Sequence, residues 1–345
     1  MGRRRGFISK NDSRTDLWCA PEARIVRPVL RHLARRESLA RRESLARCES
    51  LARCESFDQA VTGAAGMGAA AVATSGAPSV SLADVTIAFR LAGGAAYTAV
   101  QDASLAVGAG EFVAIVGPTG CGKSTLLNVA AGLLAPASGR VDIFGAPLAG
   151  LNRDAGYLFQ SDALFPWKTA VENVAIGLEI AGMSGAEARA RAQQWMGRVG
   201  LAGFGARYPH MLSGGQRKRV GLAQVLIRDP RILLMDEPFG PLDAQTRQIM
   251  GNLLLDLWSA DRKAVLFVTH DLEEAIALSD RVVIMSAGPA ARIIGDWRVP
   301  LPRPRDIADV KLEKAFQDLH REIWAVLKEE VLKGYAQTEA ALSGT

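Results

Sequence analysis

The feature that most constrains the fold is a glycine-rich loop, "GPTGCGKST", at residues 117–125. It follows the continuous apolar run "EFVAIVG" and precedes "LLNVAAGLL", so the expected order is buried strand, loop and helix. Gly117, Gly122, Lys123 and Ser124 match the G-x-x-x-x-G-K-[ST] spacing of a phosphate-binding loop. Such a loop joins a strand of a central sheet to a helix, so the sequence predicts an α/β fold that binds a nucleotide.

The residue types of this loop suit a chain of phosphates. Gly120 and Gly122 let backbone N–H groups approach phosphate oxygens, and the following helix directs its positive end to the same place. Lys123 would place a charge on the β- and γ-phosphates, and Ser124 would offer a hydroxyl to Mg²⁺. We interpret Cys121 as a small loop residue, with redox sensing as the alternative. The predicted nucleotide-binding residues of the loop are Gly117, Pro118, Thr119, Gly120, Cys121, Gly122, Lys123, Ser124 and Thr125.

Two further apolar runs end in residues that could act on the nucleotide. "RILLMDEPFG" predicts a buried strand ending in Asp236 and Glu237, and "AVLFVTHDLEEA" predicts one ending in His270. Since strand ends of this kind meet at one edge of a sheet, we expect these groups beside the phosphates. Asp236 would hold Mg²⁺, Glu237 would polarise the attacking water, and His270 would reach the γ-phosphate. The alternative is a pair of acids that start a turn and a structural histidine.

A second glycine turn, "LSGGQ", opens the segment "LSGGQRKRVGLAQVLI". Ser213 is predicted to cap a helix, and Gly214 and Gly215 expose backbone N–H groups where the helix dipole favours an anion. A long mixed region separates this turn from the first loop, so we expect a head-to-tail dimer. In it, each Ser213 turn closes over the ATP held by the partner's Lys123. The alternative is an ordinary glycine-rich helix start.

The first 78 residues differ from the rest. Residues 33–56 are four copies of a six-residue unit, and the uncharged stretch 59–80 reads as a linker. We expect residues 1–78 to be a disordered or mis-annotated extension, with Met67 as the genuine start. The alternative is a basic arm that touches acidic lipid or nucleic acid.

The composition argues against several classes of protein. The formal net charge of +5 at pH 7 arises in residues 1–66, so the body gives little support for a nucleic-acid partner. The four cysteines have no metal-ligand spacing and suit a reducing cytoplasm. No stretch of the sequence is expected to span a membrane.

The segments "GPTGCGKST", "LFQ", "LSGGQ", "LLMDEP" and "VTHD", in this order, resemble the ATP-binding subunits of ABC transporters. The resemblance covers roughly residues 79–335. It implies an α/β P-loop NTPase domain over residues 79–300, with a mixed β core, an antiparallel β subdomain and a helical subdomain at about 161–230. It also implies ATP hydrolysis with ATP and Mg²⁺ as cofactors.

The resemblance assigns further residues. Gln160 matches the loop glutamine that senses Mg²⁺ and links to the membrane partner, and Asp243 matches the aspartate that crosses the dimer. Phe89 is expected to stack on adenine, with Tyr97 as the alternative. The predicted catalytic residues are then Glu237, His270, Gln160 and Lys123, the metal ligands are Ser124, Gln160 and Asp236, and the further nucleotide contacts are Phe89, Ser213, Gly214, Gly215, Gln216 and Asp243.

Three further segments indicate which group of ABC transporters the chain resembles. "LFPW", "EPFGPLDAQTR" and "SAGPAARIIGDWRVPLPRPRD" resemble importers of nitrate, sulfonates, taurine and bicarbonate. This implies a homodimer at the cytoplasmic face of the inner membrane, integral-membrane permease subunits and an external solute-binding protein, with no nucleic acid. The alternatives are a soluble ABC ATPase acting on nucleic acid or ribosomes, and a small-molecule kinase, which "LSGGQ" opposes.

The C-terminal segment 301–345 is expected to be a helical tail packed on the domain. Its apolar residues recur near helical spacing. These are Leu312, Phe316, Leu319, Ile323, Leu327 and Val331.

Overall fold

The computed structural model describes residues 76–91 and 95–343. The predictions for the hexapeptide repeats, the Met67 start and nearly all of the extension 1–78 lie outside the described residues. Among the described residues, no helix has the length and apolarity needed to cross a bilayer.

The order of the elements is that of an α/β protein. Along the chain it reads β1 (Val80–Arg90), β2 (Ala96–Val107), β3 (Phe112–Val116), α2 (Lys123–Ala130), β4 (Ser138–Ile143), β5 (Ala146–Pro147), β6 (Ala155–Leu158), α3 (Ala170–Ile180), α4 (Gly185–Arg198), η2 (Pro209–Met211), α5 (Gly214–Leu226), β7 (Ile232–Asp236), α6 (Ala244–Ala260), β8 (Ala264–Thr269), α7 (Leu272–Leu278), β9 (Arg281–Met285), β10 (Ile293–Arg298), α8 (Ile307–Val310) and α9 (Lys314–Ser343).

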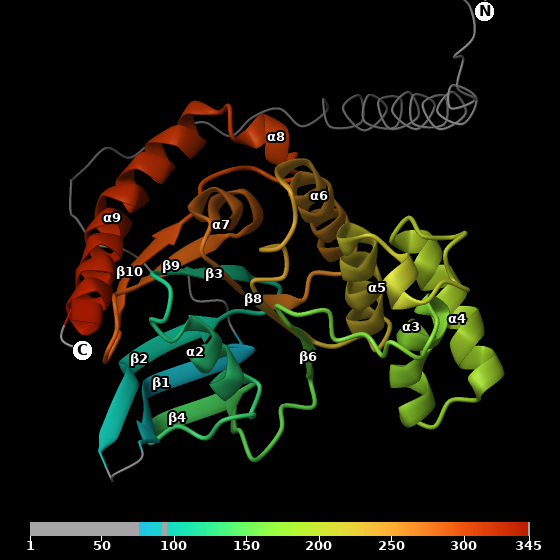
Figure 1. Cartoon of the computed structure of the whole chain (residues 1–345), viewed down its shortest axis with the longest axis horizontal. Helices are drawn as coiled ribbons and strands as arrows, with labels where there is room; N and C mark the ends of the chain where they lie inside the picture. The colour runs from blue at the N-terminus through green and yellow to red at the C-terminus, as the bar shows by residue number, and fades with distance from the viewer. Residues whose placement is uncertain (1–75, 92–94, 344–345) are drawn as a thin grey trace, which may run out of the picture. The chain divides into compact units, whose positions relative to one another are not determined.

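A six-stranded sheet in the order β10-β9-β3-β8-β7-β6 forms the centre (Figure 1). The strands from β9 to β6 are parallel, and β10 adds an antiparallel edge. Every residue of β3 and β8 is buried, which explains their unbroken apolar sequences. The sheet is mixed, as predicted, and the carboxyl ends of β3, β7 and β8 meet at one edge.

A second, four-stranded sheet in the order β2-β1-β4-β5 is antiparallel throughout. Its hairpin pairs Phe89 with Tyr97. The segment before β10 joins the two sheets, because the Ala291 N–H donates to the Ala99 carbonyl at 3.0 Å. This sheet is the predicted antiparallel part of the fold.

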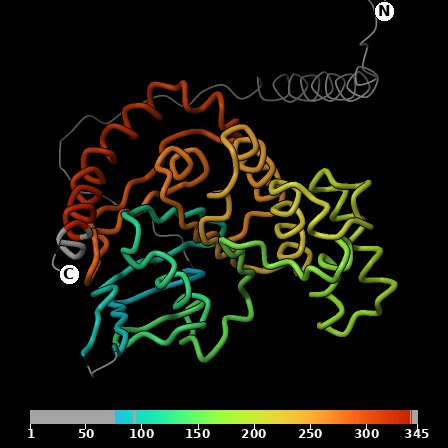
Figure 2. The backbone as a smooth tube through the Cα atoms, viewed as in Figure 1, coloured from blue at the N-terminus to red at the C-terminus, as the bar shows by residue number. Residues whose placement is uncertain are grey.

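Helices α3, α4 and α5 form a separate layer beyond the β6 edge (Figures 1 and 2). Each begins at a hydroxyl residue whose side chain accepts a backbone N–H three residues on, namely Thr169, Ser184 and Ser213. Val174, Met196 and Val220 are fully buried between the three helices. This helical layer has its own small core.

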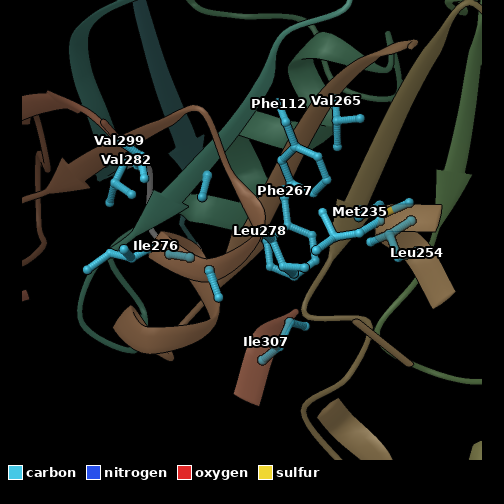
Figure 3. Close-up of a cluster of buried hydrophobic side chains, with 14 of the residues drawn as sticks. Phe112, Met235, Leu254, Val265, Phe267, Ile276, Leu278, Val282, Val299 and Ile307 are labelled. Atoms are coloured by element: carbon cyan, nitrogen blue, oxygen red, sulfur yellow. The ribbon is translucent and has the colours of Figure 1, made fainter. Parts of the chain in front are cut away.

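The main core lies on one face of the six-stranded sheet. Phe112, Phe267 and Met235 project from neighbouring strands toward Leu278 of α7, with Ile307 of α8 nearby (Figure 3). Helix α9 extends this core, because Phe316, Leu319, Ile323 and Leu327 are buried and Val331 is partly buried. The prediction for Leu312 was wrong: it lies before α9 begins and is 77% exposed.

Candidate functional site

The loop between β3 and α2 adopts a conformation that requires glycine. Gly120 and Gly122 have φ of +81° and +94°, in the left-handed region, and Gly122 caps α2. A Cβ on Gly122 would stand 2.6 Å from Val100 Cγ2. Lys123 is 5% exposed, and its Nζ donates to the carbonyls of Gly117 and Pro118 at 2.9 and 3.0 Å. The loop is therefore folded around the lysine ammonium, which stands at the start of the helix.

Ser124 and Asp236 meet across the sheet. The Ser124 hydroxyl donates to Asp236 Oδ1 at 2.7 Å. Burial is the main cause that raises the pKa of Asp236. Beside it, the Tyr157 hydroxyl donates to Asn128 Oδ1 at 2.9 Å, and burial followed by the Asp236 carboxylate raises the Tyr157 pKa. A hydroxyl and a carboxylate this close are hard oxygen donors of the kind that Mg²⁺ takes.

No cluster of three or more His, Cys, Asp or Glu that could hold a metal occurs among residues 76–91 and 95–343.

Glu237 stands at the centre of a second group. Its φ is +42°, an uncommon conformation for a residue with a side chain, and its N–H donates to the Val268 carbonyl at 2.9 Å. Glu237 Oε2 lies 3.1 Å from His270 Nδ1 and accepts a hydrogen bond from Gln160 Nε2 at 3.3 Å. Backbone strain of this kind gathers at functional sites, because the surrounding structure must hold it in place.

Ser124, Gln160, Glu237 and His270 line one cavity of about 530 Å³, and Asp236 lies behind Ser124, off its wall. A cavity of this volume is within the usual range for small-ligand sites. The lining residues come from β1, β2, the glycine loop and the ends of β6, β7 and β8, and they are Phe89, Tyr97, Ala99, Thr119, Gly120, Gly122, Lys123, Ser124, Thr125, Gln160, Glu237 and His270.

Two aromatic rings line this cavity. Phe89 and Tyr97 face each other across the β1–β2 hairpin and are 40% and 37% exposed. Both of the aromatic residues considered for adenine stacking therefore line the cavity.

The second glycine turn lies away from this cavity. Among the described residues that line it, none comes from 213–216 or the turn that ends at Asp243. Ser213 and Gln216 form a capping box on α5, with the Ser213 N–H donating to Gln216 Oε1 at 2.9 Å. Asp243 caps α6, and its hydrogen bonds with Thr246 lower its pKa. A Cβ on Gly215 would stand 2.6 Å from Thr246 Cγ2, so the two turns touch.

Three loop residues also lie off the cavity wall. Cys121 is fully buried, and burial raises the pKa of its thiol. A protonated, buried thiol reacts slowly, which favours the packing interpretation over redox sensing. Gly117 and Pro118 instead line a neighbouring cavity whose other wall is α9, at Val331 and Tyr335.

Sequence reasoning missed a link between α5 and Gln160. Lys218 is 4% exposed, and its Nζ donates to the Gln160 carbonyl at 2.6 Å. Asp162 accepts from Arg217 Nε at 2.6 Å and lies 3.2 Å from Lys218 Nζ. Only the adjacency of "RK" to "SGGQ" could have suggested these cations. Tyr157 and the approach of α9 to the glycine loop were missed as well, because nothing local marks them.

The parallel sheet, the phosphate-type loop and the carboxylate–histidine pair at the strand ends define a P-loop nucleotide hydrolase. A family model described as "ABC transporter" matches residues 100–240. The ABC transporter ATP-binding protein MJ0412 of Methanocaldococcus jannaschii, itself uncharacterized, is 44% identical over 235 residues, which cover 68% of this chain and 86% of that protein. This chain therefore belongs to the ABC transporter ATP-binding proteins and is an ATPase of that family.

Other relatives belong to the same family of ATP-binding proteins. The taurine import ATP-binding protein TauB of Yersinia pestis is 47% identical over 191 residues, 55% of this chain and 75% of that protein. TauB of Burkholderia pseudomallei is 45% identical over 228 residues, 65% and 88% of the two chains. A solved dimeric structure of the ATP-binding cassette MJ0796, in a post-hydrolysis state with ADP and Pi, aligns with a TM-score of 0.58 at 33% identity, covering 65% of this chain and all of that one. The predicted fold class and family are confirmed.

Proposed function

We propose that this chain is the ATP-hydrolysing motor subunit of an importer of a small anion such as taurine, another sulfonate or nitrate. The single observation that carries the proposal is the similarity to taurine import ATP-binding proteins, 47% identity over 191 residues for TauB of Yersinia pestis.

The cavity suits MgATP. The rings of Phe89 and Tyr97 would enclose adenine at the mouth, and the N–H groups of the glycine loop would bind the phosphates at the other end. Lys123 would exchange its two carbonyl partners for phosphate oxygens, which bind an ammonium more strongly. Ser124, Asp236 and Gln160 would hold Mg²⁺, which supplies positive charge against the phosphates.

Hydrolysis then follows from the Glu237 group. The Glu237 carboxylate accepts a proton from water as the water oxygen bonds to the γ-phosphorus and the bond to the ADP oxygen breaks. His270, hydrogen-bonded to Glu237 through Nδ1, would donate from its other ring nitrogen to the γ-phosphate when both ring nitrogens carry a proton. Gln160 would hold the carboxylate from the opposite side.

The Ser213 turn would act on the ATP of a second copy. Ser213 caps the N-terminus of α5, Gly214 and Gly215 form its first turn, and none of these residues lines the cavity of its own chain. A head-to-tail pair would bring it over the partner's Lys123 and set Asp243 at the shared face. The dimeric state of the MJ0796 cassette supports this arrangement.

The permease would dock beside Gln160. A cavity of about 410 Å³ opens between β6, α3 and the end of α5, with Arg153 and Arg228 on its wall. Phe159 and Trp167, on the loop that follows, are 43% and 70% exposed, as at a surface that awaits a partner. A helix seated there would press on the Gln160 loop, and Lys218 would pass the movement to α5. Peripheral attachment to the inner membrane and an external solute-binding protein complete the proposed system.

Two experiments test the proposal. Deleting the gene and growing cells with taurine or an alkanesulfonate as sole sulfur source, or nitrate as sole nitrogen source, tests the solute. Loss of growth on one medium, rescued by sulfate or ammonium, identifies the anion; normal growth on both contradicts the solute class.

The second experiment tests the assembly. Glu237→Gln with ATP should give a stable dimer by light scattering, because ATP would stay bound without hydrolysis. A strictly monomeric protein contradicts the head-to-tail dimer.

A further inference from the structure

Arg247, on the first turn after the Asp243 cap, connects two loops of the nucleotide site. Its Nη2 donates to the Leu242 carbonyl at 3.1 Å, and its Nη1 donates to Asp271 Oδ2 at 3.0 Å. Leu242 ends the turn that follows Glu237, and Asp271 follows His270 directly. One guanidinium therefore holds the backbone of the first loop and the carboxylate of the second.

Hydrogen bonds to α7 and to Thr269 hold the second loop, which contains His270 and Asp271. Asp271 caps α7, accepting the Glu274 N–H at 3.1 Å, and its own N–H donates to Thr269 Oγ1 at 3.1 Å. The buried Thr269 hydroxyl donates in turn to Glu274 Oε2. His270 thus lies between two residues, Thr269 and Asp271, whose side chains are both hydrogen-bonded, and Asp271 is the one that Arg247 also contacts.

The two loops also touch directly. A Cβ on Gly240 would lie 3.5 Å from the Glu237 carbonyl and 3.9 Å from His270 Cε1. The distance of 3.1 Å between His270 Nδ1 and Glu237 Oε2 lies near the long end of the usual hydrogen-bond range, so a small rotation of either loop would weaken this contact. The planar guanidinium of an arginine can donate hydrogen bonds to two acceptors in fixed directions at once. A lysine ammonium is a compact point charge and does not fix two acceptors in this way.

The burial around Arg247 indicates that the surrounding structure holds its guanidinium in this position. Arg247 Nε and Glu274 Oε1 are the two buried side-chain atoms of the described residues that have no hydrogen-bond partner. Both residues line one cavity of about 160 Å³ between α6, α7 and α8. A buried polar atom without a partner costs stability, so the guanidinium keeps its Leu242 and Asp271 bonds at the expense of its third donor.

We propose that Arg247 is a positioning residue that sets the His270–Glu237 contact by tying the Leu242 turn to Asp271. The inference rests on the proposed roles of Glu237 and His270 in hydrolysis. Arg247 is not among the residues that line the nucleotide cavity, so it would act on the rate and not on ATP binding.

The test is the ATPase activity of the purified full-length chain, measured well below its unfolding temperature. Arg247→Gln is expected to lower kcat roughly tenfold to a hundredfold, the usual effect of misplacing a reacting group, with KM for ATP within about twofold. Asp271→Asn keeps the α7 cap but loses the charge, and should lower kcat similarly. The double variant should be no slower than Arg247→Gln alone, because both changes remove one interaction.

The matched control is Arg191→Gln, which breaks an exposed ion pair with Glu187 on α4 and should leave kcat unchanged. A kcat for Arg247→Gln within twofold of the parent overturns the inference, as does a double variant whose losses multiply. A KM that rises with kcat unchanged also overturns it. Glu237→Gln and His270→Ala run in parallel: if these retain full activity, the proposed function fails instead.

Discussion

Glu274 carries a buried carboxylate whose ionisation should set part of the pH dependence of stability. It is 8% exposed on α7, and its Oε1 is without a partner among the described residues. Burial, the largest cause, raises its pKa from 4.5 to about 7; the nearby Asp271 adds to this, and the Thr269 hydrogen bond opposes it. The folded protein therefore prefers the protonated acid more than the unfolded chain does.

The sign follows from linkage. As the pH rises above about 4.5, the unfolded chain releases this proton first, so the folded state loses relative stability. The loss grows until the pH reaches about 7 and is complete above it. A shift of this size, at about 1.4 kcal/mol per pKa unit, corresponds to about 3 kcal/mol.

Glu274→Gln should abolish this dependence, because the amide stays neutral and its oxygen can still accept from Thr269. The difference in free energy of unfolding between variant and parent, from urea denaturation, should be under about 1 kcal/mol at pH 5 and about 3 kcal/mol in favour of the variant at pH 8. Glu273→Gln, which removes a surface ion pair with Lys311, is the control and should change stability by less than about 1 kcal/mol at pH 8. The same difference at both pH values, or a less stable variant at pH 8, refutes the reasoning.

Three further outcomes are expected. Ile323→Ala, at a fully buried position of α9, should lower the free energy of unfolding by about 2–5 kcal/mol. The control Leu332→Ala, at a position that is 59% exposed, should change it by less than about 1 kcal/mol. Equal effects of the two variants would contradict the packing of α9. Gly215→Ala should lower ATPase activity, because the new Cβ would stand 2.6 Å from the Thr246 methyl. Adding Thr246→Ser removes that methyl and should restore activity. A double variant that stays inactive would disprove the steric cause. Cys121 should be alkylated by iodoacetamide far more slowly in the native chain than after denaturation, read peptide by peptide in a mass spectrometer; equal rates would mean that the thiol is accessible.

Much of the fold could be predicted because its signals are local. The apolar runs of β3, β7 and β8 report burial on both faces, and Ser213 reports a helix start. These patterns depend on a few consecutive residues, so they can be recognised without knowing the partners. Leu312 is the counter-example: helical spacing placed it on the buried stripe, but α9 starts after it and leaves it exposed.

By itself, the sequence determined the class of site, since the spacing of the glycine loop and the acids at strand ends indicates a site that binds a nucleotide and acts on its phosphates. Only the tertiary structure decided which groups meet. Ser124 and Asp236 are 112 residues apart yet hydrogen-bonded, and Lys218 reaches the Gln160 carbonyl across 58 residues. The same holds for Arg247 and Asp271, and for the approach of α9 to Pro118. Such contacts depend on strand order and helix packing, which the whole chain sets and no short segment encodes.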